Sequence, residues 1–249
     1  MSKKPWGPVL RKWYQGIRPD DDWSLRIYRD QQRLQQVLPK LIRHDSNCLD
    51  VGAHQGDFLQ MILDLAPAGK HWAFEPLPQL CEQVKARFPA VEVREMALAD
   101  FEGSAQFKWV KNAPAWSGLE LQQLPVESEV REIPVEVRKL DQILPQGYRT
   151  DFIKIDVEGA ELQMLEGARA TIEKFQPIVL FEHAAIHNQH YGTKPEDLYQ
   201  FFQDCDMGIY RMDLELNYGI EEFKAIYHIS HQSNYDRTAE TNFIAMMHP

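Results

Sequence analysis

Three acidic residues lie at or near the ends of short apolar segments, where buried strands are expected to stop. Asp50 lies in the segment LDV, Glu75 closes HWAFE, and Asp156 follows IKI. Carboxylates accept hydrogen bonds from ligand hydroxyls and take up protons during catalysis. The carboxyl ends of parallel strands form the edge at which open α/β sheets bind ligands. The sequence therefore indicates a ligand site built from three strand ends.

The turn after the first of these segments has the pattern D-x-G-x-x-x-G, from Asp50 through Gly52 to Gly56. Glycines allow a sharp turn and the close approach of a ligand to the backbone, so Gly52, Ala53 and Gly56 are predicted to contact a cofactor. His54 stands where a dinucleotide-binding turn has its middle glycine. This favours a ligand with a cationic amino acid end over a pyrophosphate. An ordinary turn between strand and helix is the alternative.

Glu75 ends the second predicted strand, where an acid can accept hydrogen bonds from both hydroxyls of a ribose, and Pro76 directly after it is predicted to contact the same cofactor. Glu75 can equally stabilise the start of the helix that follows Pro76. The third predicted strand leads into Met96 and Ala97, which we expect to line a pocket for an adenine ring.

Asp156 and His183 are the candidate catalytic bases. Asp156 is placed to meet either the amino acid end of a cofactor or an acceptor hydroxyl. His183 directly follows the strand IVLFE, and the pKa of imidazole lies near neutrality. A structural hydrogen bond at a strand end is the alternative role for His183. Lys154 is expected to pair with a neighbouring carboxylate.

The segment after this strand raises a metal hypothesis. His183, His187 and His190 would share one face if the segment were helical, and Glu182 could join them. The segment lacks the order H-E-x-x-H and has the composition of a partial loop, so we expect no metal ion.

The apolar segments alternate between the periods of strands and helices, which is typical of a parallel sheet with right-handed crossovers. Two further strands with an irregular loop between them interrupt the alternation over residues 104–140. We predict an N-terminal helical extension, residues 1–44, and one α/β domain, residues 45–249. The expected strands are 48–51, 71–75, 91–96, 151–155, 178–181, 208–212 and 242–247, and the expected helices are 23–42, 58–65, 79–88, 160–175 and 195–205.

The composition of the chain limits the classes of binding partner that we expect. The 249 residues carry a net charge of -10, which disfavours binding to nucleic acid or to an anionic membrane. The three cysteines lack a CxxC spacing, so neither a disulfide framework nor a zinc knuckle is expected, and a reducing, cytoplasmic location fits best. No apolar segment is long enough to span a membrane.

Four segments, LDVGAHQGDF, FEPLPQL, MALADFEGSAQF and FIKIDVEGAELQMLEGA, occur in this order within residues 45–183. Together they resemble the FkbM-type methyltransferases. The resemblance implies a Rossmann-like sheet of seven strands with an antiparallel last strand. It also implies S-adenosylmethionine as cofactor and methyl transfer to a hydroxyl of a sugar, a polyketide or a related small molecule. The family usually has Asn where this chain has His54, and imidazole, like an amide, can form hydrogen bonds.

The acceptor pocket is expected from the less regular segments. Trp109 and Trp116, in or beside the loop 108–125, and the aromatic N-terminus suit stacking against a sugar or a flat ring. The same aromatics suit a lid or a contact between copies in a homo-oligomer. Two other functions compete with methyl transfer. One is a nicotinamide-dependent oxidoreductase, which the absent G-x-G-x-x-G weakens, and the other is a non-catalytic, cofactor-binding regulatory or scaffold protein.

Overall fold

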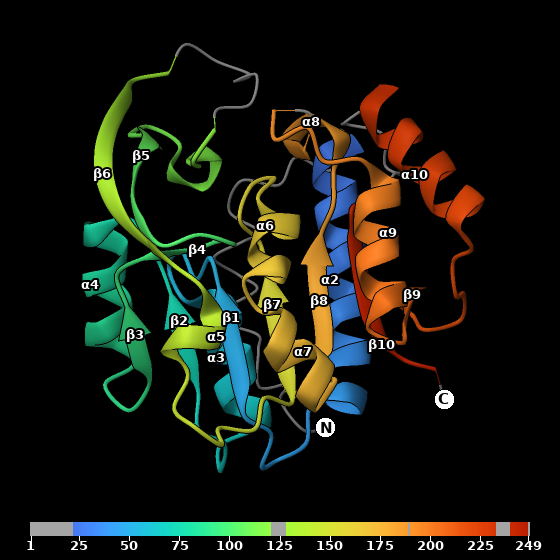
Figure 1. The fold of residues 1–249 in the computed structure, drawn as a ribbon, viewed down its shortest axis with the longest axis horizontal. Coiled ribbons are helices and arrows are strands. Elements are labelled where there is room, and N and C mark those ends of the chain that lie inside the picture. Colours follow the sequence, from blue (N-terminus) through green and yellow to red (C-terminus); the bar gives the residue numbers. More distant parts are fainter. Residues whose placement is uncertain (1–21, 121–127, 189, 233–239, 249) are drawn as a thin grey trace.

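The computed structural model describes residues 22–120, 128–188, 190–232 and 240–248. Its main feature is a seven-stranded sheet with the strand order β3-β2-β1-β7-β8-β10-β9 (Figure 1). All neighbours are parallel except β10, which runs antiparallel to both β8 and β9. The strands are β1 Cys48–Val51, β2 Trp72–Phe74, β3 Glu92–Arg94, β7 Phe152–Ile155, β8 Ile178–Glu182, β9 Met207–Arg211 and β10 Asn242–Met247. This confirms the predicted sheet and its antiparallel last strand.

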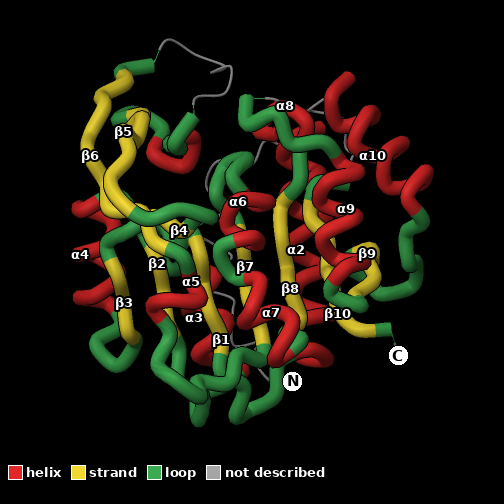
Figure 2. The backbone as a smooth tube through the Cα atoms, in the orientation of Figure 1, coloured by secondary structure: helices red, strands yellow, loops and turns green. Residues whose placement is uncertain are grey.

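Helices cover both faces of this sheet (Figure 2). On one face, Val37 and Leu38 of α2 and Ile62 of α3 pack against Phe152 and Leu180. On the other face, α6, α7, α9 and α10 bury a second apolar cluster against β1, β7, β8 and β10. Strands covered on both sides are apolar throughout, as in β1 and β7. The helices are α2 Asp22–Leu41, α3 Asp57–Leu65, α4 Pro78–Arg87, α5 Leu140–Ile143, α6 Glu161–Glu166, α7 Arg169–Phe175, α8 Ala185–Asn188, α9 Pro195–Asp204 and α10 Ile220–Gln232.

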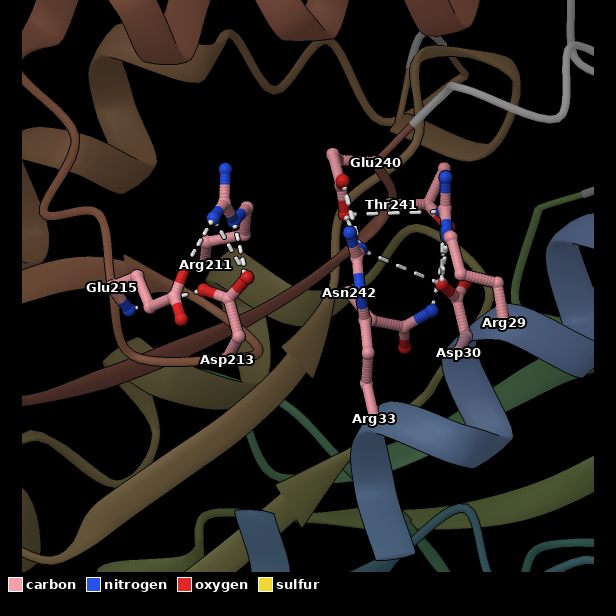
Figure 3. A network of polar contacts seen from close by, with 9 residues as sticks. All are labelled: Arg29, Asp30, Arg33, Arg211, Asp213, Glu215, Glu240, Thr241 and Asn242. Carbon is pink, nitrogen blue, oxygen red and sulfur yellow. Dashed lines mark hydrogen bonds and ion pairs between the residues drawn. The ribbon is translucent and has the colours of Figure 1, made fainter. Parts of the chain in front are cut away.

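Helix α2 is anchored to the segment that leads into β10. Arg33 donates two hydrogen bonds to the carboxylate of Glu240, at 2.8 and 2.6 Å, and Arg29 pairs with Asp30 (Figure 3). Both bonds come from Nη1 of Arg33, and hydrogen bonds between charged groups are stronger than those between neutral groups. Residues 28–41 of the predicted N-terminal extension are thus packed on the sheet. The predicted aromatic N-terminus before residue 22 lies outside the described residues.

A smaller sheet accounts for the interruption in the alternating pattern. Its order is β4-β6-β5, formed by β4 Ala97–Leu98, β5 Gly103–Val110 and β6 Val130–Arg138. The long antiparallel pair β5 and β6 extends beyond the carboxyl edge of the main sheet (Figure 1). A short 3₁₀ helix, η1 Pro114–Trp116, follows β5 and packs beside it.

The single helix predicted over residues 160–175 was wrong, because it is broken into α6 and α7. At the break, a Cβ added to Gly167 would lie 2.1 Å from the carbonyl oxygen of Ala99. The Gly167 carbonyl accepts a hydrogen bond from the Asp141 amide at 3.1 Å instead of continuing a regular helix.

Two other expectations concern the cysteines and the membrane. Cys48, Cys81 and Cys205 are buried free thiols, and no described helix has the length and apolar character needed to cross a membrane.

Candidate active site

A cavity of about 430 Å³ opens at the carboxyl ends of β1, β2, β7 and β8. Its volume falls in the range of pockets that enclose small ligands, roughly 300–1,000 Å³. Most of the residues predicted to bind a cofactor lie in its wall. These are Gly52, Ala53, His54, Glu75, Pro76, Met96, Ala97 and Asp156.

The turn after β1 adopts the conformation that its glycines allow. Gly52 and Gly56 have φ angles of 76° and 77°, in the left-handed region. A Cβ at Gly52 would lie 1.9 Å from the backbone oxygen of Asp156, so the ends of β1 and β7 are in direct contact. The position of Gly56 differs from the predicted contact with a cofactor. It is not part of the cavity wall defined by the described residues, and its Cα faces the ring of Phe88, 2.6 Å from an added Cβ.

Glu75 is held rigidly by backbone amides. Its two carboxylate oxygens accept hydrogen bonds from the amide of Leu77 at 2.9 Å and from that of His54 at 2.8 Å. Burial raises the pKa of Glu75 to about 7, although these hydrogen bonds oppose the shift. Each carboxylate oxygen keeps a further lone pair, so both can still accept a hydrogen bond from a ligand.

His54 lies beside Glu75 in the cavity wall. Burial lowers the pKa of its imidazole, so the ring is neutral at physiological pH. Its Nε2 atom is buried and has no hydrogen-bond partner among the described residues. A buried polar atom without a partner is rare in native structures, and His54 is one of the residues that line the cavity.

A buried ammonium group lies under the centre of the site. Lys154 Nζ is 3.4 Å from Asp50 Oδ1, 3.4 Å from Asp156 Oδ2 and donates to the Gly52 carbonyl at 2.7 Å. Burial opposes the charge of Lys154, but the two carboxylates outweigh it and hold its pKa above the usual value. This confirms the predicted pairing of Lys154 with a carboxylate.

Asp50 has a different position from the one predicted. It is fully buried below the cavity and does not belong to the wall that the described residues form. Burial raises the pKa of Asp50 to about 6, and the neighbouring Lys154 opposes this shift. Asp50 is therefore the buried counter-charge of Lys154 rather than a contact for a ligand.

The two candidate bases are separated by the structure. The side chain of Asp156 is 43% exposed and lines the cavity. The imidazole of His183 is 1% exposed and stacks on Tyr227 and Phe223 of α10, with ring centroids 4.7 and 5.5 Å away. Burial lowers the pKa of His183 to about 3, and it is not among the described residues of the wall. We therefore assign no catalytic role to His183.

Several wall residues were not predicted. Asp30 and Gln31 come from α2, and Asn242 comes from the start of β10. Trp116 and Ser117 line the cavity from the loop after β5, as the aromatic pattern indicated for Trp116, whereas Trp109 packs in the small sheet. The three histidines of the metal hypothesis do not meet: His183 is buried, His190 is exposed, and only His187 lines the cavity.

Comparison with known proteins identifies the class. The model of the methyltransferase FkbM domain matches residues 50–208, which is more than half of the chain. The chain therefore belongs to the FkbM methyltransferase family, as the sequence motifs indicated.

Individual relatives agree with this assignment. The chain is 28% identical over 181 residues to the 2-O-methyltransferase NoeI of Sinorhizobium fredii, covering 66% of this chain and 72% of NoeI. It is 28% identical over 153 residues to the methyltransferase sdnD of Sordaria araneosa, covering 48% and 59% of the two chains. The crystal structure of a methyltransferase FkbM from Methylobacillus flagellatus aligns with 97% of this chain and 60% of its own, with a TM-score of 0.51 and 16% identity. At that identity the likeness shows the fold alone.

The buried ion pairs predict a large stability effect for Lys154→Met. The variant leaves the Asp50 carboxylate buried without its counter-charge, and we expect a loss of about 3–5 kcal/mol in the free energy of unfolding at pH 8. Without Lys154 the pKa of Asp50 in the folded protein rises further above its value in the unfolded chain. Protonation of Asp50 therefore favours the folded state at low pH, and this contribution to stability is lost as the pH increases. Denaturant unfolding at pH 5 and pH 8 measures both effects, and the loss should be larger at pH 8.

Lys85→Met is the matched control, because the solvent-accessible side chain of Lys85 pairs with the exposed Glu82 on the surface of α4. We expect a change within about 0.5 kcal/mol for this variant. A similar small change for Lys154→Met would contradict the structural role assigned to the buried ammonium.

Proposed function

We propose that this chain is an S-adenosylmethionine-dependent O-methyltransferase that methylates a hydroxyl of a small molecule, of the sugar or polyketide type. Membership of a methyltransferase family supports the reaction class. The similarity to a relative named as a 2-O-methyltransferase supports oxygen as the methyl acceptor. The observation that carries the proposal is the cavity itself, which places Glu75 and Asp156 in one wall, at the ends of the two strands that flank β1.

The wall between β1 and β3 fits the cofactor. Glu75 would accept hydrogen bonds from the ribose hydroxyls, and the unpartnered Nε2 of His54 supplies a polar contact beside it. Met96, Ala97 and Leu98 provide apolar lining for an adenine ring. When bound, S-adenosylmethionine supplies an activated methyl group that passes from sulfur to the acceptor oxygen, while the electrons of the broken S–C bond stay on sulfur.

Asp156 is the base of the proposed reaction. Its partly exposed carboxylate takes the proton from the acceptor hydroxyl as the oxygen gains the methyl group, which removes the positive charge from that oxygen. The ion pair with Lys154 keeps the carboxylate in place. Because the donor is already activated, alignment and exclusion of water account for much of the remaining rate enhancement.

Other residues of the cavity wall are suited to the acceptor. Gln31 is 7% exposed, and both its amide nitrogen and its amide oxygen are without a hydrogen-bond partner among the described residues. Such an amide can donate to one ligand oxygen and accept from a hydroxyl. Trp116 and Ser117 line the same cavity and offer an aromatic face beside a polar group. The net charge of -10 further favours a small acceptor without many negative charges.

The direct test is formation of S-adenosylhomocysteine from S-adenosylmethionine over a panel of sugars, hydroxylated polyketides and simple alcohols. We expect acceptor-dependent turnover and a product that is heavier by one methyl group in place of one hydrogen. A protein that binds the cofactor but methylates an amine, and no hydroxyl, would contradict the choice of oxygen.

Glu75→Gln tests the ribose contacts. Removing a charged acceptor of hydrogen bonds costs about 1.5–3 kcal/mol, so we expect S-adenosylhomocysteine to bind roughly 10 to 100 times more weakly. Calorimetric titration measures this. Glu92→Gln, an exposed glutamate on the adjacent strand β3, is the control and should bind like the unmodified protein. Equal affinities of the two variants would exclude Glu75 from the ribose site.

The raised pKa of Glu75 adds a pH dependence to the same measurement. Because this pKa is about 7, the ionised form that accepts both hydrogen bonds becomes dominant only above neutrality. The affinity for S-adenosylhomocysteine should therefore increase between pH 6.5 and 8. Glu75→Gln should show a flatter profile over this range.

Asp156→Asn tests the base. The amide cannot take up the proton, so we expect kcat to fall by about 10²–10⁴ at saturating cofactor while the protein remains folded. Asp204→Asn, an exposed residue at the end of α9, serves as the control and should keep its activity. Unchanged turnover by Asp156→Asn would contradict this assignment, because another group would then have to act as the base.

Gln31→Leu tests the acceptor wall. The variant removes both polar atoms while keeping a side chain of similar size, so we expect KM for the acceptor to rise roughly tenfold or more. The affinity for S-adenosylhomocysteine should not change. Gln36→Leu, an exposed position on the same helix, is the control. If Gln31→Leu changed only the affinity for S-adenosylhomocysteine, Gln31 would belong to the cofactor site and not to the acceptor site.

A further inference from the structure

A second group of polar side chains meets at the edge of the cavity. Glu158 comes from the turn after β7, Glu182 ends β8, and His187 lies on α8. His187 Nδ1 is 3.2 Å from Glu158 Oε2 and 3.8 Å from Glu182 Oε2. One ligand atom from each residue lies within 4.8 Å of the other two. Two carboxylate oxygens and one imidazole nitrogen therefore converge on a single point.

The fold fixes these three residues relative to each other. A Cβ at Gly159 would lie 2.6 Å from the backbone oxygen of His187, so the turn after β7 touches α8 directly. Below this contact, the Asn188 amide donates to the Gly159 carbonyl at 3.2 Å and to the buried carboxylate of Glu161 at 2.9 Å. Glu161 in turn accepts a hydrogen bond from the Gly159 amide at 3.0 Å. The cluster thus has a rigid support, as metal sites require.

We propose that Glu158, Glu182 and His187 bind one divalent transition-metal ion. Two carboxylates this close to one site repel each other, and a dication compensates their charge. Carboxylate oxygens suit Mn²⁺, whereas imidazole nitrogen suits Zn²⁺ and Fe²⁺, so the mixed set favours these ions over Mg²⁺ or Ca²⁺. Three protein ligands leave coordination positions open towards the cavity for water or for a substrate oxygen.

The location of the cluster gives the ion a role, which rests on the proposed function. Glu158 lies two residues beyond Asp156, and both line the same cavity. An ion here would hold the acceptor oxygen and lower the pKa of its hydroxyl, so that the proton passes more easily to Asp156. Where more than one coordination position is open, the ion would favour acceptors that carry a second oxygen next to the reacting hydroxyl, such as a diol or an α-hydroxy carbonyl compound.

The test is the binding of Mn²⁺ to the full chain after treatment with EDTA and without cofactor, followed by electron paramagnetic resonance. We expect saturable binding of one Mn²⁺ per chain, competition by Zn²⁺, and a magnetic coupling to one histidine nitrogen in pulsed spectra. His187→Ala and Glu182→Gln should each weaken binding at least about tenfold. His190→Ala, an exposed histidine two residues beyond α8, should bind Mn²⁺ like the unmodified chain.

Several results would overturn the proposal. One is the absence of saturable binding of Mn²⁺ or Zn²⁺, which would leave the cluster as an ion pair between a protonated His187 and the two glutamates. Another is saturable binding of Mn²⁺ without magnetic coupling to a nitrogen. This coupling is measured on the unmodified chain, so it does not depend on whether the variants fold. Titration of the same metal-free preparation with S-adenosylhomocysteine separates this failure from a failure of the proposed function.

Discussion

The site depends on one buried charge. Lys154 places an ammonium group between the carboxylates of Asp50 and Asp156 and against the Gly52 carbonyl, at the junction of β1 and β7. The parallel register makes Asp50 and Lys154 direct neighbours across the two strands. A lysine buried in this way is tolerated only with close partners, so its presence fixes how the two strand ends meet.

The remaining geometry follows from that junction. Because β1 and β7 meet at Gly52 and Asp156, the glycine turn and the carboxylate of Asp156 enter the cavity from adjacent strands. Two more carboxylates line the cavity on either side of this junction: Glu75 follows β2, and Glu182 ends β8. The part of the cavity that we propose for the cofactor is built from strand ends and tight turns. The part that we propose for the acceptor also uses α2 and the start of β10, and the ion pair of Arg33 and Glu240 connects these two elements (Figure 3).

Sequence reasoning placed a residue correctly where its position follows from a local pattern. Gly52, Glu75 and Asp156 stand at strand ends, and the edge of a parallel sheet brings such ends together without further information. It failed where the direction of a side chain depends on distant packing. Asp50 points below the cavity towards Lys154, and His183 is covered by aromatic rings of α10, a helix more than thirty residues further along the chain. Gln31 gave no signal, because helical periodicity identifies a buried face but not the cavity beside it. The spacing of the three histidines also carried little information, because α8 has only four residues and does not extend from His183 to His190.

The central claim is that the cavity binds S-adenosylmethionine through the strand ends of β1, β2 and β7. The most direct measurement is calorimetric titration of the purified chain with S-adenosylhomocysteine and, separately, with NADH. The account predicts binding of S-adenosylhomocysteine with one site per chain and no binding of NADH. Binding of NADH in preference, or no binding of S-adenosylhomocysteine, would contradict it, since the carboxylate of Glu75 and the turn at Gly52 would then serve a different ligand.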